Sequence, residues 1–344
     1  MKLVPSENHA QSPDSAAVPP AGAGPPQAAK PLSSRGKPVE TIVPAETVVI
    51  CTSPKAGSGR GAERIPQLVQ RLVDQGLRVV CSDRLAEIID TVAATDPARL
   101  RAVVPAGGDG TISLIADRLP IGTPLVPFPM GTENLLSRYF GFTNDPRAAV
   151  RTILSGRLSR WDAGRANGRL FLVMVSCGWD AEVVRAMHLT RRGHIGRLSY
   201  AKPIVHAVRK YHYPPIMVRA SEEDAEGSSF ECRGALMFNL PCYGGGLKIE
   251  PDARGDDGLL DLCALQYGST LSTLRYVAGV FSGRHRTWKD FRRQRARRWY
   301  LSSPSRVSYQ IDGDYGGRLP LDVECLPDRL TLRIPPPAPD RNWS

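Results

Sequence analysis

The chain has 344 residues, of which 42% are apolar, so it is long enough for two domains with buried cores. It contains no uninterrupted apolar run of about 18 residues, which argues against a membrane-spanning helix. The formal net charge of +11 favours an anionic partner, such as a nucleotide, a phospholipid surface or a nucleic acid.

The cysteines and the N-terminal composition bear on the compartment. Seven cysteines occur without any C-x-x-C pair, and most of them lie in apolar runs. Their odd number and their surroundings predict reduced, buried thiols in a cytoplasmic protein. Residues 1–44 are rich in Pro, Ala, Ser and Gly and poor in large apolar residues, so we expect a disordered tail without the apolar core of a signal peptide.

Residues 101–119 predict an anion-binding turn. An apolar run at 102–104 predicts a buried strand, and apolar side chains at 112, 115, 116 and 119 have the spacing of one helix face. The string between them is Gly107-Gly108-Asp109-Gly110-Thr111. Glycines let a ligand approach the backbone amides, and a helix N-terminus favours an anion. The residues alone predict a phosphate-binding strand–turn–helix, with a tight turn capped by Thr111 as the alternative.

Strands and helices alternate around this turn. Strands are predicted at 47–51, 77–81 and 102–104, and amphipathic helices at 65–73, 85–92 and 112–119. This alternation predicts βαβ units and a mainly parallel sheet, whose ligands gather at the carboxyl ends of the strands. A dinucleotide fingerprint, Gly57-x-Gly59-x-x-Ala62 with Asp83 beyond it, is a weaker alternative, because Ser53 to Lys55 separate the strand from the glycines.

The Gly-Gly-Asp-Gly-Thr string resembles the signature of the kinase superfamily that joins diacylglycerol and sphingosine kinases with NAD kinases. Ser53-Pro54-Lys55-Ala56-Gly57 is similar to the Asn-Pro-x-x-Gly loop of the lipid kinases, with Ser in place of Asn. Gly131-Thr132-Glu133-Asn134 is similar to the second motif of the family, Gly-Thr-x-Asn before a helix. Ser113, Leu114 and Leu135 depart from residues that many relatives carry at these motifs.

The resemblance implies that ATP binds at these loops and that Mg²⁺ is the cofactor. The phosphates would lie against Gly107, Gly108, Gly110 and Thr111, and Asp109 would orient Mg²⁺ or the phosphates. Further nucleotide contacts are expected from Lys55, Gly57, Ser82, Thr132 and Asn134. As the alternative, Thr132 or Asn134 is simply a helix cap.

Strands dominate the second half of the chain. They are predicted at 170–176, 216–220, 235–240, 259–265, 307–311 and 330–334, with helices at 146–155, 200–211 and 271–281. By resemblance this half is a β-rich, sandwich-like domain over residues 161–335. It would follow an α/β ATP-binding domain over 45–160 and precede a short tail, 336–344. The acceptor is expected to enter between the two domains near Trp179 and the 200–211 helix.

A lipid-kinase segment begins at Pro251-Asp252-Ala253 and continues through Asp257-Gly258-Leu259-Leu260. It resembles the Pro-x-Ala and Asp-Gly-x-Leu pattern, which we do not associate with NAD kinases. In relatives the Asp and two backbone carbonyls hold a magnesium ion, which implies Asp257 with the carbonyls of Arg254 and Leu259 here. Oxygen ligands suit Mg²⁺. A loop of solvated acids without metal is the alternative.

Asp312-Gly313-Asp314 resembles the Asp-Gly-Glu of the family, whose last acid is the proposed general base. A kinase that acts on an alcohol needs a carboxylate to take the hydroxyl proton. Asp314 is one methylene shorter than Glu, and a displacement of about 1 Å can cost about 10²-fold in rate. The Asp-Gly pair also predicts a hairpin turn.

The motifs together predict an ATP-dependent lipid kinase that phosphorylates a diacylglycerol-like lipid at a membrane surface. The basic run 284–298, with Trp288 and Phe291, predicts either contact with anionic lipid or a solvated helix and loop; nucleic acid is not expected. Peripheral membrane association and a homodimer are left open. An NAD kinase and a catalytically inactive nucleotide- or membrane-binding regulator remain the alternative functions.

Overall fold

Parallel strands build the first half of the structure. The computed structural model describes residues 46–52, 63–190, 211–221 and 229–336, all within one unit. The parallel strands lie in the order β4-β3-β1-β2, with β5 added beside β3. They are β1 (Thr47–Thr52), β2 (Arg78–Ser82), β3 (Leu100–Gly107), β4 (Pro124–Leu125) and β5 (Phe128–Pro129). The predicted mainly parallel α/β sheet is confirmed.

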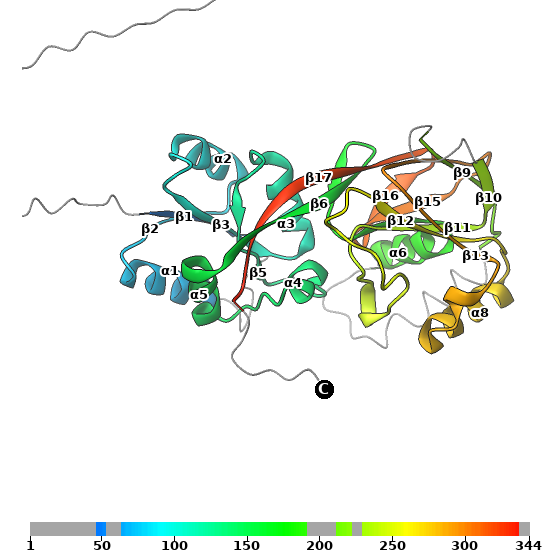
Figure 1. Ribbon diagram of the computed structural model, residues 1–344, viewed down its shortest axis with the longest axis horizontal. Helices are drawn as coiled ribbons and strands as arrows, with labels where there is room; N and C mark the ends of the chain where they lie inside the picture. The colour runs from blue at the N-terminus through cyan, green and yellow to red at the C-terminus, as the bar shows by residue number, and fades with distance from the viewer. Residues whose placement is uncertain (1–45, 53–62, 191–210, 222–228, 337–344) are drawn as a thin grey trace, which may run out of the picture. The chain divides into compact units, whose positions relative to one another are not determined.

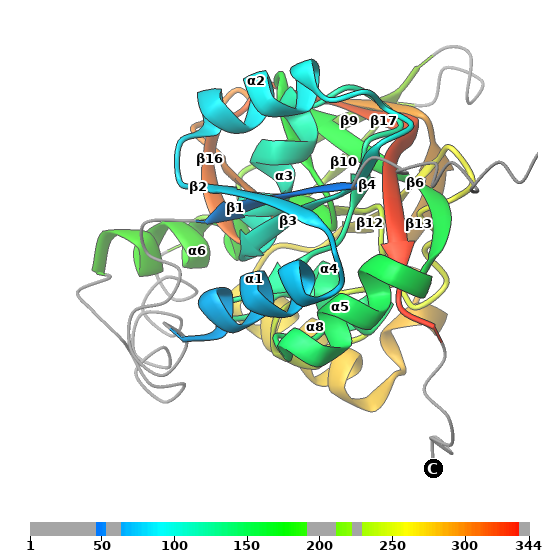
Figure 2. The ribbon, with the colours of Figure 1, turned by 90° about the vertical axis from the view of Figure 1, so that its left-hand side faces the viewer.

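Helices cover both faces of this sheet, as Figure 2 shows. They are α1 (Arg64–Asp74), α2 (Leu85–Ala94), α3 (Asp109–Arg118), α4 (Leu135–Phe140) and α5 (Pro146–Ser155). Alternate side chains of β1 point to opposite faces, as expected for a strand. Val48 packs in one core with Leu68 of α1 and Ile153 of α5, whereas Val49 packs in another with Ile88 of α2 and Ile112 of α3.

Two antiparallel layers build the second half. The inner sheet has the order β13-β12-β11-β8-β15-β16, and the strands opposite it have the order β10-β9-β14-β17, with β6 beside β17 and β7 beside β6. The inner strands are β8 (Met174–Cys177), β11 (Gly234–Phe238), β12 (Leu260–Leu265), β13 (Phe291–Ala296), β15 (Ser308–Ile311) and β16 (Asp314–Arg318). The opposite strands are β6 (Arg157–Ala166), β7 (Arg169–Phe171), β9 (Ile216–Ala220), β10 (Ser229–Cys232), β14 (Arg298–Ser302) and β17 (Leu321–Ile334).

A shared apolar core joins the two layers. Val175 and Leu262 of the inner sheet belong to the same buried cluster as Val218 and Val323 of the opposite strands. The predicted sandwich-like domain is confirmed, because alternating buried side chains of each layer face the other layer. Helices α6 (Trp179–Thr190) and α8 (Thr270–Ser282) and the 3₁₀ turns η2 (Gly244–Gly246) and η3 (His285–Thr287) complete this half.

Strand β17 belongs to both halves of the structure. It pairs antiparallel with β14 and along most of β6, and its end pairs parallel with β4 through Thr331 and Leu332. Figure 1 shows β6 and β17 running together from one half into the other. The sequence analysis assigned residues 330–334 to the second domain alone and did not foresee their place in the first sheet.

The basic run 284–298 forms one 3₁₀ turn and a strand, whereas one of its two expectations was a solvated helix and loop. It contains η3 and the edge strand β13, in which Phe291 and Ala296 are buried and the arginines between them are more exposed. Arg293 pairs with Glu250 and Asp252, and Arg295 pairs with Asp257 and Asp261. Cross-strand pairing and carboxylates nearby therefore override the weak helical pattern.

Two further expectations concern the cysteines and the membrane. All seven cysteines are free thiols, and five of them are buried while Cys81 is exposed and Cys242 is half-buried. Among the described residues, no helix is both long and apolar enough to cross a bilayer. The helix predicted over 200–211 falls almost wholly outside the described residues.

We expect Gly164→Ala to destabilise the fold. A Cβ atom at Gly164 would lie 1.9 Å from Cζ of Phe171, a ring that is fully buried in the sandwich core. Overpacking of this kind costs about 1–3 kcal/mol or more, which urea denaturation would measure. Gly244→Ala is the matched control, because a Cβ there has no neighbour within 4 Å. Equal free energies of unfolding for the two variants would contradict this packing.

Candidate functional site

The turn between β3 and α3 is a strand–turn–helix, as its sequence predicts. The carbonyl of Gly108 accepts hydrogen bonds from the N–H groups of Thr111 at 2.9 Å and Ile112 at 3.2 Å, which starts the helix. A Cβ atom on Gly107 would lie 2.3 Å from Oγ1 of Thr111, so a side chain at this position would collide with the turn. The first N–H groups of a ten-residue helix lie at the end of β3, where an anion is favoured.

The loop of the second motif touches this turn through the backbone. A Cβ atom on Gly131 would lie 2.7 Å from Cα of Gly108. Asn134 adopts a left-handed conformation with φ of 49°. Its side-chain oxygen accepts a hydrogen bond from the N–H of Gly131 at 3.0 Å, and its side-chain nitrogen donates to the carbonyl of Gly131 at 2.8 Å. Asn134 therefore shapes this loop, while Thr132 is exposed beside it. Their contact with a nucleotide stays a prediction.

Asp109 joins the two loops. Its carboxylate accepts hydrogen bonds from Leu135 N–H at 2.7 Å and Leu136 N–H at 3.2 Å, at the start of α4. Burial raises the pKa of Asp109, although these two hydrogen bonds oppose the rise. The side chain thus holds α4 against the turn, and its role toward Mg²⁺ or phosphates stays a prediction.

Other predicted nucleotide contacts lie around the first loops. The Ser82 hydroxyl donates to Glu87 at 2.6 Å and accepts from the N–H of Arg84 at 3.0 Å, so it shapes the start of α2. Ser82 ends β2 at the same edge of the sheet as the turn after β3. Lys55 and Gly57 lie outside the described residues.

Asp312 anchors the turn between β15 and β16. Its carboxylate accepts three hydrogen bonds, from the N–H groups of Leu172 at 2.7 Å, Val173 at 2.9 Å and Met174 at 3.0 Å. Asp312 and Gly313 have φ of 47° and 83°, as the hairpin turn requires. Burial raises the pKa of Asp312 to about 6, against these hydrogen bonds, and the charge of Asp109 adds to the rise.

Asp314 lies beside the glycine-rich turn. Its Oδ2 is 3.9 Å from the position of a Cβ atom on Gly110, and Nη2 of Arg169 lies 3.2 Å from the same oxygen. The Asp314 side chain is half exposed. The tertiary structure therefore brings together the two predicted catalytic segments, although about 200 residues separate them.

Arg169 was missed by the sequence analysis. It begins β7, directly after the turn Asn167-Gly168, and no family motif marks it. The Asn-Gly pair between two apolar runs signals a hairpin, so the sequence could have placed Arg169 on a strand but not beside Asp314.

Ser113, which departs from the family motif, has a structural role in this protein. The hydroxyl of Ser113 is buried and donates to the carbonyl of Leu170 at 2.7 Å, which ties α3 to β7. Leu114, the next residue, is 48% exposed on the outer side of α3.

A chain of buried hydrogen bonds leads from the Asp312-Gly313-Asp314 turn into the sandwich domain. The N–H of Gly313 donates to Oε1 of Gln310 at 2.7 Å, and Nε2 of Gln310 donates to the Ser176 hydroxyl at 2.9 Å. The hydroxyls of Ser176 and Tyr243 both donate to the Asp180 carboxylate. Burial raises the pKa of Asp180, which is fully enclosed by this network. The network links the turn that carries Asp314 to the wall of a pocket.

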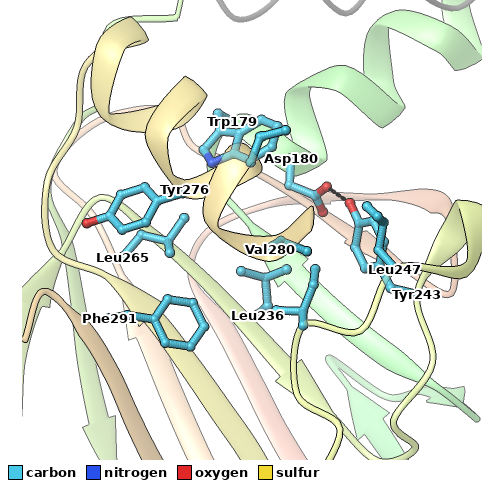
Figure 3. Close-up of a pocket in the computed structure, with 11 residues that line it drawn as sticks. Trp179, Asp180, Leu236, Tyr243, Leu247, Leu265, Tyr276, Val280 and Phe291 are labelled. Atoms are coloured by element: carbon cyan, nitrogen blue, oxygen red, sulfur yellow. Dashed lines mark hydrogen bonds between the residues drawn. The ribbon is translucent and has the colours of Figure 1, made fainter. Parts of the chain in front are cut away.

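This pocket is apolar and lies between α6, α8 and the inner sheet (Figure 3). Asp180 and Tyr243 form its polar end. Its apolar lining consists of Trp179, Leu236, Leu247, Ile249, Leu265, Tyr276, Val277, Val280 and Phe291. Trp179 lines this pocket, which lies within the second half, whereas the sequence analysis expected the acceptor between the two domains; the position of the acceptor stays a prediction. The apolar lining with a polar end suits an amphipathic ligand.

Cys242 and Tyr243, at the polar end of the pocket, pack against the apolar core cluster that also contains Leu136 of α4. Cys242 precedes Tyr243; burial raises the pKa of its thiol to about 11, and the charge of Asp109 contributes to that rise.

The predicted metal site was tested against its donors. Asp257 accepts from the N–H of Leu259 at 3.1 Å, and its other oxygen pairs with Arg295. Within the described ranges, no cluster of three or more His, Cys, Asp or Glu side chains is arranged to hold a metal ion. Arg295 pairs with one oxygen of Asp257, so Mg²⁺ at this carboxylate would compete with the guanidinium. A site built from Asp257 and the carbonyls of Arg254 and Leu259 stays a prediction.

Comparisons with known proteins bear on both domains. A family described as "Diacylglycerol kinase catalytic domain" matches residues 47–166, and one described as "YegS C-terminal NAD kinase beta sandwich-like domain" matches residues 173–334. A protein named "Diacylglycerol kinase" from Mycobacterium tuberculosis (strain ATCC 25618 / H37Rv) is 29% identical over 298 residues, which cover 84% of this chain and 95% of that protein. A protein of the same name from Staphylococcus saprophyticus is 24% identical over 295 residues, covering 83% and 94%.

A solved structure shares the fold. A crystal structure of a diacylglycerol kinase from Bacillus anthracis str. Sterne superposes with a TM-score of 0.63 at 20% identity. The alignment covers 85% of this chain and 98% of that one. At this identity the likeness supports the arrangement of the α/β and sandwich halves.

Asp312→Asn tests how the turn is held. The folded carboxyl has a pKa of about 6, against about 3.9 in an unfolded chain. The folded state therefore binds this proton more tightly, and the free energy of unfolding should fall as pH rises between the two values. Asparagine at position 312 cannot ionise, so the free energy of unfolding of the variant should lack this part of the pH dependence.

The measurement is urea unfolding of both proteins from pH 4 to 7.5. The stability of the wild type relative to Asp312→Asn should decrease across this range, by on the order of 2–3 kcal/mol. A relative stability that is constant or rises with pH would contradict the raised pKa.

Proposed function

Because the chain belongs to the diacylglycerol kinase-like family of lipid kinases, we propose that it transfers the γ-phosphate of ATP to the hydroxyl of a diacylglycerol-like lipid. The observation that carries this proposal is the position of Asp314, whose carboxylate lies beside Gly110 of the glycine-rich turn. A carboxylate next to an anion site is the arrangement that an alcohol kinase needs.

ATP would bind with its phosphates at the start of α3, against Gly107, Gly108, Gly110 and Thr111. The contact between this turn and the Gly131–Asn134 loop supports the proposal, because two loops then face one ligand. Further contacts would come from Lys55, Gly57, Ser82, Thr132 and Asn134. Mg²⁺ would accompany the nucleotide and neutralise phosphate charge.

Asp314 would act as the general base. It would accept the proton of the acceptor hydroxyl as the oxygen attacks the γ-phosphorus in line with the leaving ADP oxygen. Arg169, 3.2 Å from Asp314, would orient this carboxylate and add positive charge near the transferring phosphoryl group. Asp312 and the Gln310–Ser176–Asp180 network would fix the turn and so hold the shorter side chain of Asp314 in place.

The acceptor chain would occupy the pocket beside α8. Its polar end, at Asp180 and Tyr243, is joined by hydrogen bonds to the turn that carries Asp314. An acceptor hydroxyl at this end would therefore lie toward Asp314 while its hydrocarbon extends along Leu236, Leu265 and Val280. In this proposal residues 45–160 bind ATP and residues 161–335 bind the lipid.

Asp314→Asn should abolish most of the activity. The assay measures transfer of labelled γ-phosphate to diacylglycerol, sphingoid base and ceramide in mixed micelles. Loss of a general base costs about 10²–10⁴-fold in kcat, with a smaller effect on ATP binding. Asp322→Asn is the matched control, since Asp322 is likewise partly exposed and paired with an arginine, Arg298. Transfer that survives Asp314→Asn within a few-fold would remove Asp314 from the role of base.

The same assay separates the alternative functions. Asp109→Ala should also lose activity, because α4 and the turn would lose their shared carboxylate. Phosphorylation of NAD without lipid would identify an NAD kinase. ATP binding without transfer to any acceptor would identify a regulator.

Val280→Trp should block the pocket selectively. The larger ring would occupy the space between α8 and the inner sheet that Val280 lines. We expect kcat/KM for long-chain diacylglycerol to fall about tenfold or more, while activity on a dibutyryl or dioctanoyl acceptor changes little. Val73→Trp, at an exposed position of α1, is the control. Equal losses on short and long acceptors would contradict a hydrocarbon pocket here.

A further inference from the structure

Helix α8 carries an apolar face that points away from the protein. Leu271 is 77% exposed, Leu274 is 59% exposed and Phe281 is 73% exposed. With the exposed Ala278 they recur at i, i+3, i+7 and i+10, which places them on one side of the helix. We call these four residues the α8 outer face. Tyr267, 60% exposed, precedes the helix.

The opposite side of α8 is apolar as well, because Tyr276, Val277 and Val280 line the pocket. Apolar side chains on two opposite sides of a helix are normally both covered, by protein or by lipid. Figure 1 shows α8 at the edge of the sandwich domain, and no described element packs on its outer face strongly enough to bury it.

The helix is held firmly on its inner side. Gly279 packs so closely on Trp288 that a Cβ atom would lie 2.3 Å from the ring. The hydroxyl of Thr273 donates to that of Tyr213 at 2.8 Å, and the hydroxyl of Tyr276 donates to Asp290 at 2.6 Å. The outer face is therefore displayed by an ordered helix and is not the side of a frayed segment.

Basic side chains without acidic partners follow the helix. Arg275 pairs with Asp290, and Arg286 pairs with Asp252. Arg284 and Lys289 are exposed and form no ion pair with any described residue. Unpaired cations beside an exposed apolar helix face complement a surface that is apolar inside and anionic outside.

We propose that the α8 outer face inserts into the interface of an anionic bilayer, with Arg284 and Lys289 at the level of the headgroups. This inference rests on the proposed function in one respect: an acyl chain would pass from the bilayer around α8 into the pocket on its inner side. The binding itself requires neither ATP nor catalysis, so it can be tested separately.

The first experiment measures cosedimentation of the full chain with sucrose-loaded vesicles of phosphatidylglycerol and phosphatidylcholine, without ATP. The wild type should bind. The double variant Leu274→Glu/Phe281→Glu should bind at least about tenfold more weakly, because both positions lose their apolar contact with the bilayer. The matched control is Val73→Glu/Ile121→Glu, which changes apolar residues that are 50% and 70% exposed in the first domain. It should bind like the wild type.

The second experiment isolates the charges. Arg284→Gln/Lys289→Gln should weaken binding to anionic vesicles, by roughly fivefold for each charge, and should reduce its dependence on salt. Binding to vesicles of phosphatidylcholine alone should be the same as for the wild type. Arg286→Gln, which removes a paired arginine, is the control for a general loss of positive charge.

Two readouts keep this proposal distinct from the kinase assignment. On a monomeric short-chain acceptor, Leu274→Glu/Phe281→Glu should keep the activity of the wild type, and only transfer to vesicle-borne lipid should fall. If no variant phosphorylates lipid, vesicle binding still decides the present proposal. Unaltered urea unfolding verifies the fold, and Leu274→Ser/Phe281→Ser replaces the glutamate pair if that variant is unfolded.

Three results would overturn the proposal. The wild type fails to bind anionic vesicles, or the α8 variant binds them as tightly as the wild type. In the third, light scattering shows that the wild type is a homodimer and the α8 variant a monomer, while the two bind vesicles equally. A second copy of the chain would then be the occupant of this face.

Discussion

The continuous pairing of β17 is the constraint on which the site depends. One strand pairs with β14 and β6 and then enters the first sheet beside β4. Because its hydrogen bonds fix the register in both places, the turn after β3 and the turn before β16 are held at one location. A cleft between domains on a free linker would not keep Asp314 next to Gly110.

The acids of the motifs divide into structural and accessible ones. Asp109 accepts the N–H groups that begin α4, and Asp312 accepts three N–H groups at the start of the sandwich. These half-buried carboxylates fix loops. Asp314 is half exposed and faces the turn, which makes it the one of the three available to a substrate. The two half-buried acids thus hold loops, and Asp312 anchors the turn that carries Asp314.

The positive charge of the chain has more than one use. Several arginines of β13 are paired with carboxylates within the sandwich, so the density of basic residues in 284–298 does not measure free charge. Arg284 and Lys289, which form no ion pair with any described residue, follow the exposed apolar face of α8 in the chain. Position relative to an apolar surface, more than the total of +11, distinguishes a lipid surface from other anionic partners.

The sequence by itself determined the family, the α/β and sandwich-like halves, and the turns that begin α3 and β16. These follow from local rules, because glycine strings, Asp-Gly turns and apolar periodicity act over a few residues. It did not determine the place of residues 330–334 in the first sheet, the strand formed by 291–296, or the pairing of Arg169 with Asp314. Only the tertiary structure decided these, since strand partners and ion pairs join residues far apart in the chain, and no local pattern encodes which ones meet.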